Sequence, residues 1–374
     1  MLDVTLIVLC AGNSTRFEHK TKKQWIRIDN EPLWLNVTKR LASYSKFDSI
    51  IVASHEKELN YMKNFTDDYT FVKGGNTRQE SILNCLEKVK TKYVMITDVA
   101  RACIPQNVIL NLLNEKNNAD CIVPVLNVTD TVIYETNTIN RDNVKLIQTP
   151  QLSNTQILKN ALDTKIEFTD ESSAIKNING IIKYIQGSNE SKKLTLGNEL
   201  EELPCLTPPS NNFFTGTGFD IHAFEDNKEM FLGGVKLPYE YGFKAHSDGD
   251  VLIHSVIDAL LGACGAGDIG EFFPDTDEKY KGIDSKILLN EIVSFIYNVG
   301  YEIVNVDLTI IAQKPKINPF KNEIKTSMAN LLGIEKQFIN IKATTAEKMG
   351  FIGRAEGIAV QSIATLKYYN WKTK

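Results

Sequence analysis

Short apolar runs alternate with helix-like patterns through about the first 200 residues of this 374-residue chain. The runs lie at 5–10, 49–54, 69–72, 93–97 and 121–125, and residues 79–89 form one of the helical patterns between them. Such alternation predicts βαβ units and therefore a mostly parallel sheet covered on both faces. Ligands of such sheets bind at the carboxyl ends of the strands, so the polar residues that follow each run are candidate site residues.

The alternation stops around residues 204–212, where three prolines and two asparagines predict a linker. A chain of this length usually needs two cores, so we expect domains at 1–209 and 210–374. The second domain is predicted to contain helices at 285–299 and 318–332 and strands at 304–313, 339–344 and from 359. This ratio fits an α+β sandwich with helices on one sheet face.

Composition excludes several classes of function. A net charge of −4 and a pI near 5.9 argue against a general nucleic-acid binder. No apolar run approaches the roughly 20 residues of a membrane span, and Met-Leu-Asp-Val is no signal peptide. The six cysteines are scattered without a CxxC pair, which predicts reduced, packed thiols. We therefore expect a cytoplasmic protein.

Two clusters in the second half carry metal-ligand residues. Asp220 and His222 are two apart, so on a strand they point to the same side. His254 lies in an apolar-periodic helix from about Asp250, for which Asp248 is the predicted N-cap. Three such N/O ligands suit zinc with one open, catalytic position. The alternative is an ordinary packed histidine, but the two clusters, the second of which begins at His246, hold three of the chain's five histidines, which favours metal.

Polar loops follow three of the apolar runs in the first half. Residues 10–17 read Cys-Ala-Gly-Asn-Ser-Thr-Arg-Phe, residues 74–81 contain Gly-Gly and a serine, and Asp98 follows a further run. Small residues let backbone N–H groups approach a phosphate, and Arg16 and Lys23 are cations within reach of the same anion. Taken singly, each loop is also explained as a turn followed by a helix cap.

From about residue 213 to the end, five motifs occur in the order of one known family. They are Thr217-Gly-Phe-Asp-Ile-His-Ala-Phe224, Ala245-His-Ser-Asp-Gly-Asp250, Gly267-Asp-Ile-Gly270, Phe273-Pro-Asp-Thr-Asp277 and Lys342-Ala-Thr-Thr-Ala-Glu347. On these motifs the second half resembles 2-C-methyl-D-erythritol 2,4-cyclodiphosphate synthase. The resemblance implies a ferredoxin-like domain that forms trimers, with active sites between neighbouring subunits.

Residues 1–200 resemble a second family, 2-C-methyl-D-erythritol 4-phosphate cytidylyltransferase. The loops at 10–17, 74–81 and 97–101 carry the resemblance. So do, in order, Asp130-Thr131, Arg141-Asp142, Thr149-Pro-Gln151, Thr169-Asp-Glu171 and Lys193-Leu-Thr195. It implies a Rossmann-like α/β nucleotidyltransferase domain that makes 4-diphosphocytidyl-2-C-methylerythritol from CTP and the 4-phosphate, with Mg²⁺.

The resemblance assigns roles in the first domain. Arg16 and Lys23 would bind the CTP phosphates and stabilise charge as pyrophosphate leaves, while Arg141 and Lys193 would hold the methylerythritol phosphate. The substrate-binding residues around the nucleotide and the diol would be Gly12, Gly75, Arg78, Ser81, Asp98, Arg101, Thr131 and Thr149. Positioning and charge neutralisation are what nucleotidyl transfer chiefly needs.

The resemblance to the cyclodiphosphate synthase assigns roles in the second domain in the same way. His246 and Ser247 would contact the substrate phosphates, Thr345 would be catalytic, and Asp220, His222 and His254 would hold zinc. The methylerythritol and its loop would meet Asp268, Ile269, Gly270, Phe273, Pro274, Asp275, Thr276 and Asp277. The cytidine diphosphate pocket, supplied across the interface, would contain Ala312, Pro315, Lys316, Thr344, Thr345, Ala346 and Glu347, with Mg²⁺ on Glu347. Phe351 and Arg354 would face the trimer centre.

Several positions depart from the family patterns. Ser14 stands where the loop of the cytidylyltransferase family has glycine, and a positive φ there would strain a serine. Lys22 replaces a proline, Val99 and Ala102 interrupt an Asp-Ala-Ala-Arg-Pro motif, and Ala346 replaces a threonine. The cationic residues remain, so we expect these changes to affect affinity more than the reaction.

We therefore predict a bifunctional enzyme of the non-mevalonate isoprenoid pathway, whose intervening kinase step needs a separate protein. One alternative is a zinc hydrolase with a regulatory nucleotide-binding half, although no HExxH or equivalent supplies a general base. The other is an N-terminal half that binds nucleotide without transferring it. Pyrophosphate release, and CMP release without consumption of water, distinguish these alternatives.

Overall fold

The computed structural model describes residues 3–373. It divides into two compact units, which we describe one at a time. Unit 1 comprises Met1–Pro209 together with Asn370–Lys374, and unit 2 comprises Ser210–Tyr369. Within residues 3–373, no helix has both the length and the apolar character needed to cross a membrane.

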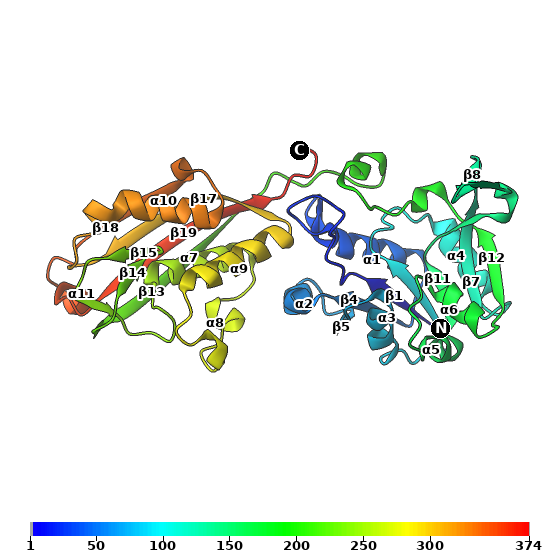
Figure 1. Cartoon of the computed structure of the whole chain (residues 1–374), viewed down its shortest axis with the longest axis horizontal. Helices are drawn as coiled ribbons and strands as arrows, with labels where there is room; N and C mark the ends of the chain where they lie inside the picture. Colours follow the sequence, from blue (N-terminus) through cyan, green and yellow to red (C-terminus); the bar gives the residue numbers. More distant parts are fainter. Residues whose placement is uncertain (1–2, 374) are drawn as a thin grey trace. The chain divides into compact units, whose positions relative to one another are not determined.

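Unit 1 is built on one large sheet (Figure 1), with strand order β10-β7-β11-β6-β1-β4-β5 and β12 also paired to β7. The strands are β1 (Val4–Leu9), β4 (Ser49–Ser54), β5 (Thr70–Lys73), β6 (Tyr93–Asp98), β7 (Cys121–Asn127), β10 (Lys145–Ile147), β11 (Gln151–Asn154) and β12 (Ile182–Gln186). The five strands predicted from apolar runs are confirmed as β1, β4, β5, β6 and β7.

The sheet is mostly parallel, as predicted, but β10 and β11 run against the other six strands. Neighbours among β6, β1, β4 and β5 are parallel, as predicted, but β11 runs antiparallel to both β6 and β7, and β10 runs antiparallel to β7. These strands follow an excursion that contains the short pair β8 (Val132–Tyr134) and β9 (Asn137–Ile139). The segment has no long apolar run, so the sequence pattern gave no signal for it.

Six α-helices of unit 1 connect the strands, and several begin at a residue that caps them. Thr77, Asn154 and Asp170 each accept a hydrogen bond from the first turn of the helix that follows. The helices are α1 (Leu33–Tyr44), α2 (Glu56–Lys63), α3 (Arg78–Leu86), α4 (Gln106–Glu115), α5 (Thr155–Leu162) and α6 (Glu171–Asn177). Helices α3, α5 and α6 share one apolar core with the sheet. Strand β6 is buried along its whole length, as expected of a strand covered on both faces.

Unit 2 has a five-stranded sheet in the order β16-β13-β19-β17-β18. The strands are β13 (Phe213–Asp226), β16 (Tyr241–Phe243), β17 (Tyr301–Ile311), β18 (Ile339–Thr344) and β19 (Gly357–Tyr368), beside a small pair, β14 (Met230–Leu232) and β15 (Val235–Leu237). Helix α7 (Val251–Cys264) packs against β13 and β19, α9 (Ser285–Asn298) against β17, and α10 (Lys321–Leu332) against β18. The helices predicted in this half and the strand predicted at 339–344 are confirmed.

Two glycines let α7 approach β13 closely. A Cβ on Gly218 would lie 1.9 Å from the carbonyl oxygen of Ser255, and one on Gly216 would lie 2.3 Å from that of Ala259. Ser255 Oγ also donates to the Gly218 carbonyl at 3.2 Å. Any side chain at these two positions would push the helix away from the strand. The glycines therefore fix the distance between the strand that carries Asp220 and the helix that carries His254.

The N-cap of α7 differs from the prediction. Asp250, not Asp248, caps the helix, accepting from Ile253 N at 3.1 Å and from the backbone of Gly233 and Gly234. The carboxylate of Asp248 instead accepts from the backbone N–H and the hydroxyl of Ser285. Asp248 bonds Ser285, 37 residues further along the chain, which the local sequence pattern did not indicate. The prediction of Asp248 as the N-cap is therefore wrong.

The prediction of six reduced thiols is wrong for one pair, because Cys103 and Cys205 form a disulfide in unit 1. Their Cα atoms are 5.7 Å apart although 102 residues separate them. Arg40 donates to the carbonyls of Ala102 and Cys205 and so ties the same two segments together. The pairing depends on the tertiary path of the chain, which residue spacing does not reveal. The other four cysteines, Cys10, Cys85, Cys121 and Cys264, are buried and form no disulfide within residues 3–373.

Candidate active sites

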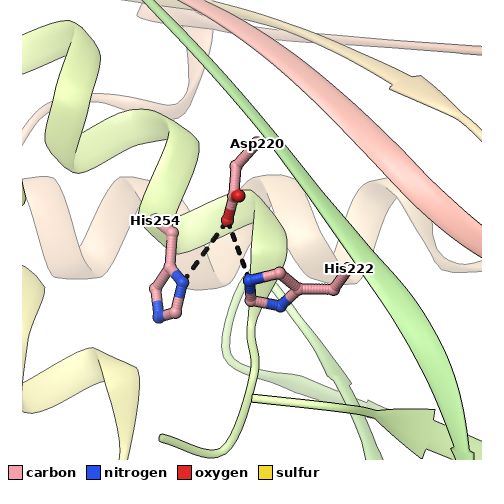
Figure 2. A group of neighbouring side chains, drawn as sticks. All are labelled: Asp220, His222 and His254. Atoms are coloured by element: carbon pink, nitrogen blue, oxygen red, sulfur yellow. Dashed lines mark ion pairs between the residues drawn. The ribbon is translucent and has the colours of Figure 1, made fainter. Parts of the chain in front are cut away.

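The three predicted metal ligands converge in unit 2. Asp220 and His222 project from the same side of β13, and His254 projects toward them from α7 (Figure 2). Asp220 Oδ2 lies 3.1 Å from Nε2 of His222 and 3.4 Å from Nδ1 of His254. One ligand atom from each residue can be chosen so that all three lie within 4.8 Å of one another. The alternation of β13 and the close approach of α7 together build this group.

Hydrogen bonding fixes which nitrogen of His222 is available. Nδ1 lies 2.8 Å from the carbonyl oxygen of Gly249. Because a carbonyl oxygen only accepts, we assign the proton to Nδ1 and a lone pair to Nε2. That lone pair faces the carboxylate of Asp220.

His254 is oriented in the same way through a hydroxyl. Its Nε2 lies 3.0 Å from Ser285 Oγ and 3.2 Å from Ser247 Oγ. Ser285 Oγ donates its proton to Asp248, so it accepts from Nε2 of His254. The remaining nitrogen, Nδ1, then carries a lone pair that also faces Asp220.

Three acceptors that face one another need a cation between them. Among the described residues, buried Asp220 Oδ2 has no hydrogen-bond partner with good geometry. Burial alone would raise the pKa of Asp220, but positive charge on the neighbouring imidazoles of His222 and His254 lowers it well below its ordinary value, so the carboxylate is ionised when a cation lies beside it. Two oriented imidazoles and one ionised carboxylate, each held by a second hydrogen bond or by burial, are a typical divalent metal set. The residues present therefore fit a metal.

A cavity of about 270 Å³ opens beside this group. His246 Nε2 is buried there without a hydrogen-bond partner among the described residues, which leaves it available for a ligand. Nine of the predicted site residues line the cavity: Asp220, His222, His246, Ser247, His254, Ile269, Gly270, Phe273 and Asp275. Asp268 is adjacent, as the N-cap of the short helix α8 (Ile269–Phe272).

The predicted cytidine diphosphate residues form a separate group. None of them lines the cavity beside Asp220. They lie where β17 and β18 end side by side, joined by a bond from Ala312 N to the Thr344 carbonyl. Thr345 Oγ1 donates to Glu347 Oε1 at 2.8 Å, and both residues are exposed. Phe351 and Arg354 lie at the short helix α11 (Gly350–Gly353) that follows.

In unit 1 a buried charge network forms at the carboxyl end of β6. Asp98 accepts from Arg78 Nε at 3.1 Å and from Lys193 Nζ at 2.6 Å. Arg78 Nη2 also lies 2.9 Å from Glu171 Oε1, whose side chain is fully buried. Asp98 N–H and Thr149 Oγ1 are 3.4 Å apart. Four predicted site residues, Arg78, Asp98, Thr149 and Lys193, and the motif residue Glu171 are thus brought together from a stretch that runs from residue 78 to residue 193.

A second network, of hydrogen bonds, fixes the predicted phosphate-binding loop at residues 10–17, which we call the phosphate loop. Gln24 Nε2 donates to the Gly12 carbonyl at 3.0 Å, and Ser14 Oγ both donates to Gln24 Oε1 and accepts from Lys23 N. Burial, with Lys193 and Arg16 close by, lowers the pKa of Lys23 from 10.5 to about 8. Clustered cations of this kind raise the local affinity for a polyphosphate.

Other predicted residues of unit 1 have local partners. Gly75 N donates to Ser81 Oγ at 3.0 Å, and Arg101 Nη1 donates to the Ser191 carbonyl at 2.6 Å. Arg141 and Thr131 lie on the exposed excursion after β7, where Arg141 donates to the Thr129 carbonyl. Within residues 3–373, no contact joins Arg141 or Thr131 to the network of Asp98.

Three carboxylates were missing from the predicted site residues. Glu171 pairs with Arg78, Glu58 accepts from Lys22, Gln24 and Trp25 behind the phosphate loop, and Asp258 accepts from Ile269 N beside the cavity. Asp258 was detectable, because it lies four residues after His254 on the same helix face. The other two contacts depend on how distant segments pack.

Comparison with known proteins divides the chain in two. Residues 4–203 match the family described as 2-C-methyl-D-erythritol 4-phosphate cytidylyltransferase, and residues 213–367 match the YgbB family. A curated protein of Aliarcobacter butzleri (strain RM4018) with the name bifunctional enzyme IspD/IspF is 83% identical over 374 residues, 100% of both chains. Its namesake in Campylobacter fetus subsp. fetus (strain 82-40) is 52% identical and covers 100% of this chain and 99% of its own. The solved structure of the bifunctional IspDF from Campylobacter jejuni has a TM-score of 0.88 and 46% identity, and the match covers 98% of this chain and 99% of that chain.

Proposed function

The chain belongs to the family of bifunctional IspD/IspF enzymes, and from that membership we propose how its two units divide the work. The enzyme transfers CMP from CTP to 2-C-methyl-D-erythritol 4-phosphate and releases pyrophosphate. It also cyclises 4-diphosphocytidyl-2-C-methyl-D-erythritol 2-phosphate to the 2,4-cyclodiphosphate and releases CMP. The observation that carries this function is that one chain matches both families and a bifunctional relative over its full length.

We propose that residues 1–209 perform the transfer and residues 210–374 the cyclisation, with a linker at about 204–212. The support is that one family match ends at residue 203 and the other begins at residue 213. The 2-phosphate that the second reaction needs is absent from the product of the first, so a separate kinase must act between them.

In the transfer reaction, Arg16 and Lys23 neutralise the CTP phosphates and the charge that grows on the leaving pyrophosphate, which Mg²⁺ shares. Gly12, Gly75 and Ser81 lie around the nucleotide. Lys193 and Arg141 hold the attacking methylerythritol phosphate, while Asp98, Arg101 and Thr131 contact its hydroxyls, with Arg78 and Thr149 beside them. The network from Glu171 through Arg78 keeps Asp98 oriented before the substrate arrives.

In the cyclisation, Asp220, His222 and His254 would hold zinc, which fits the lone pairs that they direct at one point. Zinc supplies Lewis-acid polarisation of a phosphate oxygen there. His246 and Ser247 bind the substrate phosphates, and Asp268, Ile269 and Gly270 hold the methylerythritol over the loop Phe273–Asp277. Thr345 would contact the reacting diphosphate, and Glu347 would hold Mg²⁺, which would supply positive charge beside the leaving CMP.

We propose further that the second unit is ferredoxin-like and acts as a trimer. Support comes from the separation of the two groups of site residues: those around Thr345 do not line the cavity beside Asp220. A neighbouring subunit would supply Ala312, Pro315, Lys316, Thr344, Thr345, Ala346 and Glu347, with Phe351 and Arg354 toward the trimer centre. A closed ring of three such interfaces completes every site.

Two assays on the purified full chain test the function. Pyrophosphate release from CTP and methylerythritol phosphate measures the transfer, and CMP release from the 2-phosphorylated intermediate measures the cyclisation. Lys23→Ala should abolish the first and spare the second, and His254→Ala should do the reverse. A chain that binds CTP without releasing pyrophosphate would support nucleotide binding alone. Hydrolysis of the intermediate, with water consumed, would support the zinc hydrolase instead.

A further inference from the structure

The end of the chain contributes to unit 1, although the residues just before it belong to the last strand of unit 2. Asn370–Lys374 group with Met1–Pro209, while Tyr369 groups with unit 2. Trp371 is only 5% exposed, and its indole Nε1 donates to the carbonyl oxygen of Arg27 at 2.8 Å. Trp371 lies beyond both family matches, which end at residues 203 and 367. Neither matched domain therefore accounts for this contact.

The other segment that connects the two units is bonded at almost the same place. Arg27 belongs to the short strand β2 (Arg27–Ile28), which pairs with β3 (Glu31–Pro32). Asp29 N donates to the Pro208 carbonyl at 3.2 Å, and Asp29 forms an isolated parallel bridge with Pro209. Residues 27–29 are thus bonded both to Pro208 and Pro209, just before unit 2 in the sequence, and to Trp371, just after it.

Strand β2 directly follows the turn that carries a phosphate-binding cation. The 3₁₀ turn η1 (Lys23–Trp25) ends with a bond from Ile26 N to the Lys23 carbonyl. Lys23 is the proposed ligand of the CTP phosphates, and Gln24 holds the Gly12 carbonyl of the phosphate loop. Only three residues separate Lys23 from Arg27, so the position of the Arg27 carbonyl restricts the turn.

Packing couples the same two elements. Arg27 is 1% exposed, and its guanidinium carbon lies 5.5 Å from the ring centre of Phe65. The Phe65 ring packs on Trp25 at 5.8 Å, and Trp25 Nε1 donates to the buried carboxylate of Glu58 at 2.6 Å. A movement of Arg27 would therefore disturb Trp25, and with it the turn that begins at Lys23.

We propose that Trp371 is a positioning residue for cytidylyl transfer. Its indole fixes the Arg27 carbonyl, β2 then fixes η1, and η1 sets Lys23 and Gln24 against the phosphate loop. Trp371 touches neither substrate, so its loss should weaken CTP binding rather than remove the reaction. The proposal rests on the assignment of transfer to the N-terminal unit.

The experiment compares Trp371→Phe, Trp371→Ala and, as a matched control on the next, exposed residue, Lys372→Ala, all in the full chain. Pyrophosphate release is measured against CTP concentration, and CMP release by cyclisation is measured on the same preparations. Trp371→Phe keeps most of the apolar ring but removes the donor, so KM for CTP should rise about three- to tenfold, the range of one hydrogen bond. Trp371→Ala should raise it further. The turnover number should change less than KM, and Lys372→Ala and the cyclisation should match wild type.

Other results would overturn the proposal. If Trp371→Ala lowers the melting temperature but leaves KM for CTP unchanged, Trp371 stabilises the fold without positioning the residues that bind CTP. Should Trp371→Ala fail to fold, Trp371→Phe decides, because an unchanged KM in that variant excludes a role for the hydrogen bond. If wild type releases CMP but no pyrophosphate, the failure belongs to the assignment of the N-terminal unit and not to Trp371.

Discussion

Lys193 Nζ donates to Asp98 Oδ2 at 2.6 Å, so a cation and a carboxylate that we propose to contact methylerythritol phosphate are already paired. Burial alone would raise the pKa of Asp98, but Arg78 and Lys193 outweigh it and hold that pKa at about 2. Asp98 is therefore ionised at every pH at which the enzyme would work, and it can accept hydrogen bonds from substrate hydroxyls without a change of protonation.

Asp98→Asn keeps the shape of the side chain and removes its charge. We expect kcat/KM for methylerythritol phosphate to fall about 10- to 100-fold, since a charge-assisted hydrogen bond is lost and the cations of Arg78 and Lys193 lose their partner. The matched control is Glu115→Gln, which breaks a 2.6 Å pair with Lys183 in which the carboxylate side chain is 30% exposed, against 13% for Asp98. Steady-state pyrophosphate release should separate the two variants, and equal losses in both would contradict a specific role for Asp98.

The lowered pKa of Asp98 also predicts that the free energy of unfolding depends on pH. The folded pKa of Asp98 is about 2 and its ordinary value is 3.8, so the folded state binds this proton more weakly. The resulting stabilisation is complete above pH about 4 and is lost as the pH falls through about 2. Urea unfolding of wild type and Asp98→Asn between pH 2 and 5 measures it. The difference in unfolding free energy between them should shrink toward the acid end, whereas a constant difference would refute the linkage.

Lys23 predicts a pH limit on the transfer reaction. Burial, together with Lys193 and Arg16, lowers the pKa of Lys23 to about 8 in the free enzyme. Because we propose that the ammonium form binds the CTP phosphates, kcat/KM for CTP should fall about tenfold per pH unit above pH about 8. An arginine at this position stays charged to far higher pH. In Lys23→Arg the fall in kcat/KM for CTP should therefore begin at a higher pH, even if the highest value of kcat/KM is below that of wild type. An unchanged limb in Lys23→Arg would assign the titration to another group.

Substitutions of Ser14 test how much stability is lost by having serine, rather than the glycine of the family pattern, in the phosphate loop. Its φ is +56°, a left-handed conformation that costs a non-glycine residue about 1–2 kcal/mol. Its hydroxyl offsets this cost through the bonds to Gln24 and Lys23. Ser14→Gly should change the unfolding free energy by less than about 1 kcal/mol, because strain and bonds are lost together. Ser14→Ala keeps the strain without the bonds and should lose about 1–3 kcal/mol in urea unfolding. If Ser14→Ala is the more stable of the two, the hydroxyl does not offset the strain.

Periodicity was sufficient to predict most elements and the faces of the metal ligands. Asp220 and His222 share a side because strands alternate, and His254 follows from the apolar pattern of its helix. Periodicity did not predict whether β13 and α7 lie close enough to bring the three side chains together. That closeness depends on the missing Cβ atoms of Gly216 and Gly218, which matter only once α7 lies across β13.

The errors all concern partners that are distant in sequence. Asp248 bonds Ser285, and Cys103 pairs with Cys205. Strand β11 inserts antiparallel between β6 and β7, because it returns from an excursion that the apolar runs did not mark. In each case a local pattern was compatible with several outcomes, and tertiary packing selected one.

Metal content tests the cluster directly. We expect about one zinc per chain in purified protein and almost none in His222→Ala, because two remaining ligands hold zinc poorly. The control is His55→Ala, a histidine in unit 1 whose Nδ1 accepts from Lys57 N at the start of α2. Elemental analysis after dialysis gives the readout without reference to activity. Equal zinc in wild type and His222→Ala would exclude the site.

Mixing inactive chains tests whether each cyclase site is shared between subunits. His254→Ala removes a residue of the cavity, and Thr345→Ala removes one of the separate group that pairs with Glu347. In a head-to-tail ring each site takes one half from each of two neighbours, so random exchange at equal amounts should give about one quarter of the sites both intact halves. CMP release should therefore recover to roughly a quarter of wild type. His222→Ala mixed with His254→Ala is the matched control, because both lesions lie in the same half and should restore nothing. Sedimentation must show that the chains form trimers and exchange. If they exchange and the first mixture stays inactive, or if a monomeric chain is fully active, each site is complete within one chain.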